Sequence, residues 1–409
     1  MNALESFSAI EPLKPSAENL TAILTCLGAK TSAADRDYIL ARQNPFRQKR
    51  GMGLGAYAVV QLPGGGRRPR SGGGSNFSNI NIYTTQAQTS PLTLRITEPE
   101  SGTFALVDAE GTPFTQGTVL PVPAWGRQQL STGKPAITVL QQHGPANLVG
   151  VLGAPSCELF ENGNACRFCM LNCGATNDDR SVEEIIEAFG LARQDRKAYN
   201  LTLTTGLQIS LRDVAKTVEA IAKVKRGLGG AALALEMAPF PEDGRTRMQE
   251  LKDAGLDTLM MPLDCASEVA QQQYVPGKAA LLQRSYWENV TDGVKIFGQG
   301  NLTSNILVGL EPLEETLRAM DRMLELGVIP EPLPVRWDDS KLLNGEPLPL
   351  TDPRFLIKAR TFIADYIQKN GLRETIQRTR AGCAACGGCG GIVVNNLPSL
   401  NPITSRVPS

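Results

Sequence analysis

The sequence of 409 residues contains a single histidine, His143, and equal numbers of basic and acidic residues, 41 of each. One histidine leaves no His-based catalytic pair and no His-rich metal site, so we expect His143 to be structural. A net charge of zero lacks the basic footprint of a nucleic-acid-binding protein. No segment approaches the roughly 18 consecutive apolar residues of a membrane span. The first 15 residues lack the apolar core of a secretory signal. We therefore expect a cytoplasmic protein that binds neither nucleic acid nor membranes.

Cysteine is the residue type that needs an explanation. Seven of the nine cysteines lie in two short segments: Cys157, Cys166, Cys169 and Cys173, and then Cys383, Cys386 and Cys389. In a reducing compartment such close spacing indicates metal binding or catalysis rather than disulfides. Thiolates without histidine favour iron–sulfur clusters, zinc or Cu(I). The remaining two are Cys26, which we expect to be an ordinary buried thiol, and Cys265.

The N-terminal third is predicted to contain three regions. Residues 1–50 are typical of a helical or irregular lead-in, and the glycine-rich residues 51–77 of a flexible loop. This loop lacks the Lys-Ser/Thr ending of a phosphate-binding P-loop, so it predicts no nucleotide site. Residues 78–145 are predicted to form a small β-rich domain, because short β-prone runs separated by turns lie at 80–83, 92–96, 103–107 and 136–140.

Residues 146–345 alternate between strand and helix patterns. Buried strands are predicted at 148–152, 201–204, 232–237, 259–263, 305–309 and 328–335, each followed by a helix pattern. One helix begins at the capping box Ser181 to Glu184, and two others end at Gly255 and Gly327. Strands separated by helices must be parallel. Six units are too few for a closed (β/α)8 barrel, so the predicted fold is an α/β partial (β/α)6 barrel with ligands at the carboxyl ends of its strands.

The first cysteine segment follows the first barrel strand directly. Three thiolates on a [4Fe–4S] cluster leave one iron open for a ligand such as S-adenosylmethionine (SAM). Two ligand sets remain open: Cys157, Cys166 and Cys169, which we favour because Cys157 lies at the strand end, or Cys166, Cys169 and Cys173. A four-cysteine zinc site is the competing interpretation.

The segment Cys166-Arg-Phe168-Cys169 resembles the last two cluster ligands of the radical SAM superfamily. The usual pattern is Cys-x3-Cys-x2-Cys, whereas this chain has eight residues between Cys157 and Cys166. The resemblance implies an enzyme that cleaves SAM reductively to a 5′-deoxyadenosyl radical, which abstracts hydrogen from a small-molecule substrate. It also implies a reducing partner such as flavodoxin or ferredoxin, and sensitivity to oxygen. Phe168 would then pack near the adenine.

Downstream residues extend the resemblance to SAM binding. The turn Thr204-Thr205-Gly206 resembles the family's Gly-Gly-Glu segment without its glutamate, so the two threonines would share that role. Glu236 ends the third strand, where a carboxylate can reach the ribose or the ammonium group of SAM. The segment from Asn305 to Gly309 resembles the fifth-strand element beside the adenine, with Glu311 one position early.

The C-terminal residues 346–409 are predicted to contain a final helix, opened by Asp352-Pro353, and the second cysteine segment. Cys383-x2-Cys386-x2-Cys389 is embedded in glycines that let the backbone wrap a metal cluster. We predict a second [4Fe–4S] cluster here, with zinc as the alternative. Its fourth ligand would be Cys173, Cys265 or a substrate atom.

Residues 145–392 as a whole resemble the radical SAM branch associated with nitrilase-linked biosynthetic gene clusters. The resemblance depends on the long first cysteine gap, Leu-Thr-Thr-Gly at 203–206, Pro-Gly-Lys at 276–278 and the second cysteine segment. It leaves the substrate open. The alternative from a different class is a non-catalytic thiolate protein, either a cluster carrier or a zinc-stabilised binding module.

Overall fold

A computed structural model describes most of the chain. The described residues are 13–16, 19–43, 57–63, 77–83, 90–143, 147–152, 157–169, 180–195, 200–207, 211–335, 350–372 and 381–382. The predicted ligands Cys383, Cys386 and Cys389 lie outside these residues, as does Cys173. None of the helices in the described ranges is both long and apolar enough to span a membrane.

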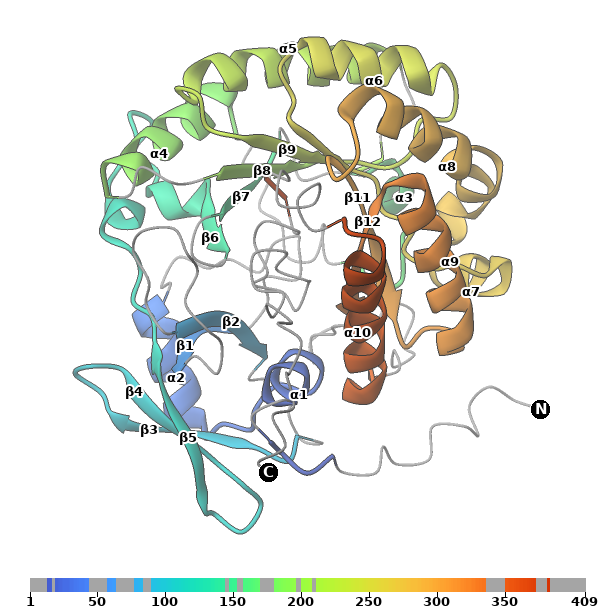
Figure 1. Cartoon of the computed structure of the whole chain (residues 1–409). Coiled ribbons are helices and arrows are strands. Elements are labelled where there is room, and N and C mark those ends of the chain that lie inside the picture. Colours follow the sequence, from blue (N-terminus) through green and yellow to red (C-terminus); the bar gives the residue numbers. More distant parts are fainter. Residues whose placement is uncertain are drawn as a thin grey trace, which may run out of the picture.

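The predicted partial barrel is confirmed as a curved seven-stranded sheet (Figure 1). Its strands lie in the order β12-β11-β10-β9-β8-β7-β6, so neighbours in the sequence are neighbours in the sheet. Strands β7 to β12 are parallel, and only β6 runs antiparallel, to β7. The bounds are β6 (Gln141–His143), β7 (Asn147–Val151), β8 (Asn200–Thr204), β9 (Leu233–Glu236), β10 (Thr258–Met260), β11 (Leu302–Val308) and β12 (Ile329–Pro334).

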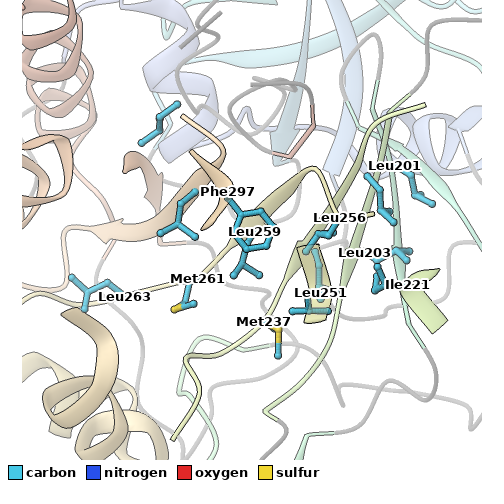
Figure 2. Packing of buried hydrophobic residues seen from close by; sticks show 14 of the residues in the cluster. Leu201, Leu203, Ile221, Met237, Leu251, Leu256, Leu259, Met261, Leu263 and Phe297 are labelled. Carbon is cyan, nitrogen blue, oxygen red and sulfur yellow. The ribbon is translucent and has the colours of Figure 1, made fainter. Parts of the chain in front are cut away.

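Helices cover the convex side of this sheet (Figure 1). Their bounds are α3 (Glu158–Glu161), α4 (Val182–Asp195), α5 (Leu211–Gly227), α6 (Gly244–Asp253), α7 (Glu268–Tyr274), α8 (Pro276–Phe297), α9 (Leu313–Leu326) and α10 (Pro353–Lys369). Figure 2 shows leucines of β8 and β10 packed with Ile221 of α5 and Leu251 of α6, all part of one buried cluster. Each such side chain stabilises the fold by about 1.5–3 kcal/mol through burial.

The opposite face of the sheet forms the inner wall of the barrel. Because side chains alternate along a strand, Ala234 and Glu236 of β9 face away from the helices that cover Leu233 and Leu235. Strand register places Met260 beside Glu236, and Thr303 beside Met260, on the same inner wall. All residues of β7 and β11 are buried, as expected for parallel strands covered on both faces.

A second, antiparallel sheet lies next to the barrel (Figure 1). Its order is β2-β1-β5-β4-β3, with β1 (Tyr57–Pro63), β2 (Phe77–Tyr83), β3 (Thr93–Glu98), β4 (Thr103–Val107) and β5 (Pro113–Val119). The helices α1 (Leu20–Cys26) and α2 (Ala33–Gln43) share its core with buried residues such as Leu94 and Phe104. Cys26 is buried beside Leu356 of α10, which links this region to the barrel.

Two local predictions are corrected by the structure. The run 136–140 is not a strand, because its first residues form the short 3-10 helix η4 (Ala136–Thr138) directly after Pro135. An earlier 3-10 helix, η3, spans Ala124–Arg127. Proline fixes the entry conformation, and Thr138 Oγ1 donates a hydrogen bond of 2.7 Å to the Pro135 carbonyl, which closes the turn. Within 51–77, residues 57–63 are a strand rather than a flexible loop, because this β-prone run pairs with both β2 and β5. Domain boundaries stay a prediction.

The predicted helix ends at the barrel are confirmed. The Glu184 N–H donates to Ser181 Oγ at 3.1 Å, and the Ser181 N–H donates to the Glu184 carboxylate at 3.0 Å. Gly255 and Gly327 have φ values of 95° and 88°, the left-handed region expected of glycines that end helices. At α10 the Asp352 side chain accepts the Arg354 N–H.

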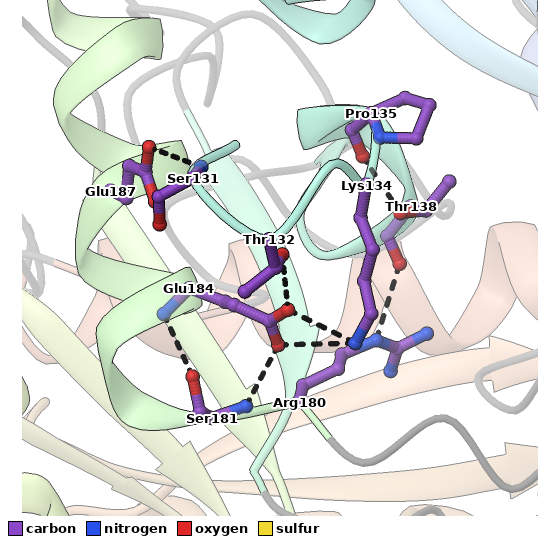
Figure 3. A network of polar contacts seen from close by, with 9 residues as sticks. All are labelled: Ser131, Thr132, Lys134, Pro135, Thr138, Arg180, Ser181, Glu184 and Glu187. Carbon is purple, nitrogen blue, oxygen red and sulfur yellow. Dashed lines mark hydrogen bonds and ion pairs between the residues drawn. The ribbon is translucent and has the colours of Figure 1, made fainter. Parts of the chain in front are cut away.

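The Glu184 carboxylate is the centre of a buried network that joins α4 to the loop before η4 (Figure 3). Besides Ser181, it accepts a hydrogen bond from Thr132 Oγ1 at 2.7 Å and pairs with Lys134 Nζ at 3.0 Å. Burial alone would raise the pKa of Glu184, but these three partners hold it below its ordinary value. The charged form therefore stabilises the fold above the ordinary pKa of a glutamate, and this contribution is lost as pH falls through the lowered value.

Glu184→Gln is expected to destabilise the protein by about 1–3 kcal/mol at pH 7, because charge-assisted bonds are lost in a buried site. Urea unfolding followed by circular dichroism measures this loss. The difference from wild type should shrink below about pH 4.5, the range where an ordinary glutamate protonates. Glu183→Gln is the matched control, since this exposed neighbour shares the first turn and pairs only with Lys223. Equal effects of the two variants would contradict the role of the buried network.

Candidate functional site

The loop that carries Cys157, Cys166 and Cys169 follows β7 at the carboxyl edge of the parallel sheet. Cys166 is buried, and the other two cysteines are half-buried. Backbone bonds fix the loop from both sides: the Arg167 N–H donates to the Tyr274 carbonyl at 2.8 Å, and the Gly277 N–H donates to the Asn164 carbonyl at 3.2 Å. The junction between α7 and α8 therefore holds the cysteine loop.

Gly277 is required for this close approach. A Cβ atom at this position would lie 2.5 Å from the Asn164 carbonyl oxygen and 2.5 Å from Leu159 Cδ2. Both distances are shorter than any normal contact, and one of them is to backbone. A larger residue would therefore push the two loops apart and move Cys166 with them.

The first cysteine is connected directly to the predicted SAM-binding turn. The Leu207 N–H, immediately after Thr204-Thr205-Gly206, donates a hydrogen bond of 3.3 Å to Cys157 Sγ. The Thr205 N–H donates to the Glu236 carbonyl at 3.0 Å, which joins the turn to the end of β9. The fold therefore connects the Cys157 sulfur, through this turn, to the end of β9.

Two other predicted residues are bonded to each other across the inner wall. Asn305 Nδ2 donates a hydrogen bond of 2.7 Å to Glu236 Oε1. This bond fixes the orientation of the amide, and Asn305 Oδ1 is buried without a hydrogen-bond partner among the described residues. Gly309 follows β11 with a φ of 102°, and a Cβ there would lie 3.1 Å from Thr351 Oγ1. Gly309 thus allows the chain to turn closely past Thr351.

Phe168 packs against a buried cluster that includes Cys265, Leu307 of β11 and Val335, which follows β12. Burial raises the pKa of the Cys265 thiol above its ordinary value, with the negative charges of Asp264 and Glu311 adding to the effect.

An ion pair that the sequence analysis did not predict lies beneath the cysteines. Lys278 Nζ pairs with Asp264, and their side chains are only 11% and 8% exposed. Burial on its own would lower the pKa of Lys278, but Asp264, Cys166 and Cys169 together hold it above its ordinary value. Two features of the sequence could have indicated this ion pair: an aspartate at the end of a buried strand and the Pro-Gly-Lys segment at 276–278. Lys278 is thus a buried cation that faces two thiols.

Glu311 supports this ion pair from the neighbouring strand. Its carboxylate accepts the Ala266 and Ser267 N–H groups at 2.7 and 2.8 Å. These bonds fix the turn in which Asp264 adopts a left-handed φ of 63°. Glu311 therefore acts on the shape of the β10 turn.

The donor set on this loop consists of thiols, the ligands that iron–sulfur clusters take. Across the described ranges, no three His, Cys, Asp or Glu side chains converge closely enough to hold one metal ion. Burial raises the pKa of the Cys166 thiol to about 11, and metal binding would release its proton. The nearby Lys278 compensates the resulting negative charge.

Comparison with known proteins places this site in a family. Residues 162–328 match the model of the radical SAM superfamily. Over 285 residues the chain is 24% identical to bacteriochlorophyllide c C-7(1)-hydroxylase of Chlorobaculum limnaeum. The aligned residues are 62% of this chain and 68% of that relative.

Similar solved structures include the FeFe-hydrogenase maturase HydG from Carboxydothermus hydrogenoformans, with 13% identity and a TM-score of 0.43. Another is methylornithine synthase (PylB), with 16% identity and a TM-score of 0.40. The HydG match covers 57% of this chain and 54% of HydG, and the PylB match 56% and 65%. The chain thus spans about half the length of the first of these structures.

Together the partial barrel and the cysteine loop define an enzyme scaffold with thiols at its carboxyl edge. Residues 162–328 carry a radical SAM domain. Such a domain implies a [4Fe–4S] cluster and SAM as cofactors.

Lys278→Met is expected to destabilise the cluster-free protein by about 3–5 kcal/mol, because it leaves the Asp264 charge buried without its cation. Urea unfolding of the apo protein measures the loss. The double variant Lys278→Met/Asp264→Asn should recover much of it, since asparagine keeps the left-handed backbone without the charge. Lys216→Met is the matched control, because its pair with Asp213 is exposed. A single variant as stable as wild type would refute this account of the ion pair.

Proposed function

We propose that the chain is a radical SAM enzyme that abstracts hydrogen from a small-molecule biosynthetic substrate, with Cys157, Cys166 and Cys169 as the ligands of its SAM-cleaving cluster. The observation that carries the proposal is the bond from the Leu207 N–H to Cys157 Sγ. It joins the first thiol to the turn expected to bind SAM, despite the long gap between Cys157 and Cys166. This argues for Cys157, rather than Cys173, as the first ligand.

When bound, the cluster supplies an electron that breaks a carbon–sulfur bond of SAM and yields a 5′-deoxyadenosyl radical. The protein's own residues bind SAM and orient it. Thr204, Thr205 and Gly206 offer their polar backbone and hydroxyl groups to the amino-acid end of SAM, next to Cys157. Glu236 suits the ribose or ammonium group, because Asn305 holds its carboxylate in place.

The remaining residues shape and insulate the site. Phe168 would pack against the adenine, with the backbone near Gly309 beside it. Lys278 balances the charge of the Cys166 and Cys169 thiolates. A reducing partner such as flavodoxin or ferredoxin would supply the electron. The link to nitrilase-associated gene clusters stays a prediction.

The second cysteine segment is proposed to hold an auxiliary [4Fe–4S] cluster on Cys383, Cys386 and Cys389. Support comes from the regular Cys-x2-Cys-x2-Cys spacing and its flanking glycines. Such a cluster raises the expected content from about four irons per chain to about eight.

Cys169→Ala is expected to abolish SAM cleavage, because it removes one of three cluster ligands. The measurement is the yield of 5′-deoxyadenosine from anaerobically reconstituted protein with dithionite and SAM. Cys26→Ala is the matched control, since this buried thiol lies in the N-terminal region and should leave the yield unchanged. Full cleavage by the Cys169 variant would refute the ligand assignment. Bound zinc and intact SAM in the wild type would favour the non-catalytic thiolate protein.

Cys386→Ala is expected to lower the iron and sulfide content by about half, from about eight to four irons per chain. Chemical iron and sulfide analysis after reconstitution measures it. SAM-cleaving cluster ligands are unchanged in this variant, so its remaining iron should equal that of a Cys383/Cys386/Cys389→Ala triple variant. An unchanged iron content would refute the auxiliary cluster.

A further inference from the structure

A buried cation lies in the first turn of α8, the longest helix in the described ranges. Lys278 is the third residue of this helix, which begins at Pro276 and runs for 22 residues. Its side chain is only 11% exposed, and its Nζ pairs with Asp264. The Gly277 N–H, one of the backbone donors that a helix leaves unpaired at its start, donates to the Asn164 carbonyl at 3.2 Å. The N-terminus of α8 therefore points at the cysteine loop.

The same junction fixes the position of Cys166 relative to this cation. Asn164, two residues before Cys166, is bonded to the start of α8, and the Arg167 N–H, one residue after it, donates to the Tyr274 carbonyl at 2.8 Å. Lys278 directly follows the residue that bonds to Asn164. Backbone hydrogen bonds therefore hold the charge of Lys278 next to the loop, and Asp264 holds its ammonium group in place.

The first turn of a helix is an unfavourable place for a buried lysine. Burial penalises the charged form of an amine. A helix N-terminus also carries a partial positive charge of about half an elementary charge, so that acidic rather than basic residues stabilise the first turn. Asp264 supplies one negative charge, which compensates the ammonium group but not the helix N-terminus as well. The positive field that remains acts on the cysteine loop in front of the helix.

The ion pair also has a direction relative to the thiols. Burial raises the pKa of Cys166 to about 11, and among the nearby charges Lys278, which lowers this pKa, acts more strongly than Asp264, which raises it. Burial also raises the pKa of Cys265, but at this thiol Asp264 acts more strongly than Lys278. The positive end of the pair is therefore directed at Cys166 and the negative end at Cys265.

Resting on the proposed SAM-cleaving cluster, we propose that Lys278 and the N-terminus of α8 raise the reduction potential of that cluster. A [4Fe–4S] cluster gains one negative charge when it takes up an electron, so a nearby positive charge stabilises its reduced form more than its oxidised form. Asp264 limits the increase, because its charge opposes that of Lys278. Lys278 acts through the cluster and needs no contact with SAM or substrate for this role. The consequence is an easier transfer of the electron from the reducing partner.

A redox titration followed by electron paramagnetic resonance, without SAM, measures the potential of the reconstituted cluster. All variants carry alanine at 383, 386 and 389, so that only the SAM-cleaving cluster is titrated. Lys278→Met should lower the midpoint potential, and Asp264→Asn should raise it. Shifts of opposite sign separate an effect of charge from a structural effect, because a loosened loop would move both potentials in the same direction. Lys278→Arg keeps the charge and should keep the potential.

Lys295→Met is the matched control, since Lys295 lies on the same helix and also pairs with an aspartate, Asp292, but is 63% exposed. It should leave the potential unchanged. Unchanged potentials in the Lys278→Met and Asp264→Asn variants, or shifts of the same sign, would overturn this inference and leave the proposed function standing. If Lys278→Met takes up no iron, the Asp264→Asn variant decides alone, and anything other than a raised potential overturns the inference. A wild-type chain without a reducible cluster, or without 5′-deoxyadenosine formation, would refute the proposed function and the inference with it.

Discussion

The parallel register of β7 to β12 is the constraint on which the rest of the structure depends. Because the strands run in one direction, their carboxyl ends meet at one edge, and every turn that follows a strand lies near the others. Cys157 follows β7, and the turn after β8 supplies the N–H that bonds its sulfur at 3.3 Å. Side-chain alternation adds the second constraint: leucines face the helices, while Glu236 and Asn305 face inward and bond to each other. A shift of one residue would exchange the two faces.

The carboxyl edge of the parallel sheet also requires a positive charge that compensates its buried thiolates. Thiolates in a buried loop are unfavourable, and burial alone raises the pKa of Cys166. The buried cation Lys278, which pairs with Asp264, compensates this negative charge. Glu311 then fixes the turn of Asp264 through two backbone bonds. The segments after the neighbouring strands β10 and β11, together with the start of α8, therefore act on the two cysteines of one loop. None of these residues needs to contact a substrate to affect the site.

Local signals in the sequence predicted the barrel well, because each buried strand and each helix end has its own short pattern. The Ser181–Glu184 capping box and the glycines at 255 and 327 are of this kind. The Lys278–Asp264 pair was missed, because it joins residues 14 positions apart whose side chains meet only after a turn and the start of α8 are in place. Residues 136–140 have β-prone side chains, but Pro135 directs them into a 3-10 turn. The strand at 57–63 was not predicted, because glycine-rich stretches flank it and because its pairing with β5 joins residues far apart in the sequence.

The inner wall carries buried polar residues on five of its strands: Thr202, Thr204, Thr258, Thr303, Asn305 and Glu331. Some of them bond within the wall, as Thr202 does to Asn147 and Asn305 to Glu236. Thr258 Oγ1, Thr303 Oγ1 and Asn305 Oδ1 have no hydrogen-bond partner among the described residues, although buried polar groups generally need partners. Ala381 and Gly382 show that the chain itself enters this space, and small residues at this point keep their own volume low. The small residues at 381 and 382 let the chain lie against Ala234 and Met260 without displacing either side chain, so this contact depends on low side-chain volume as much as on burial.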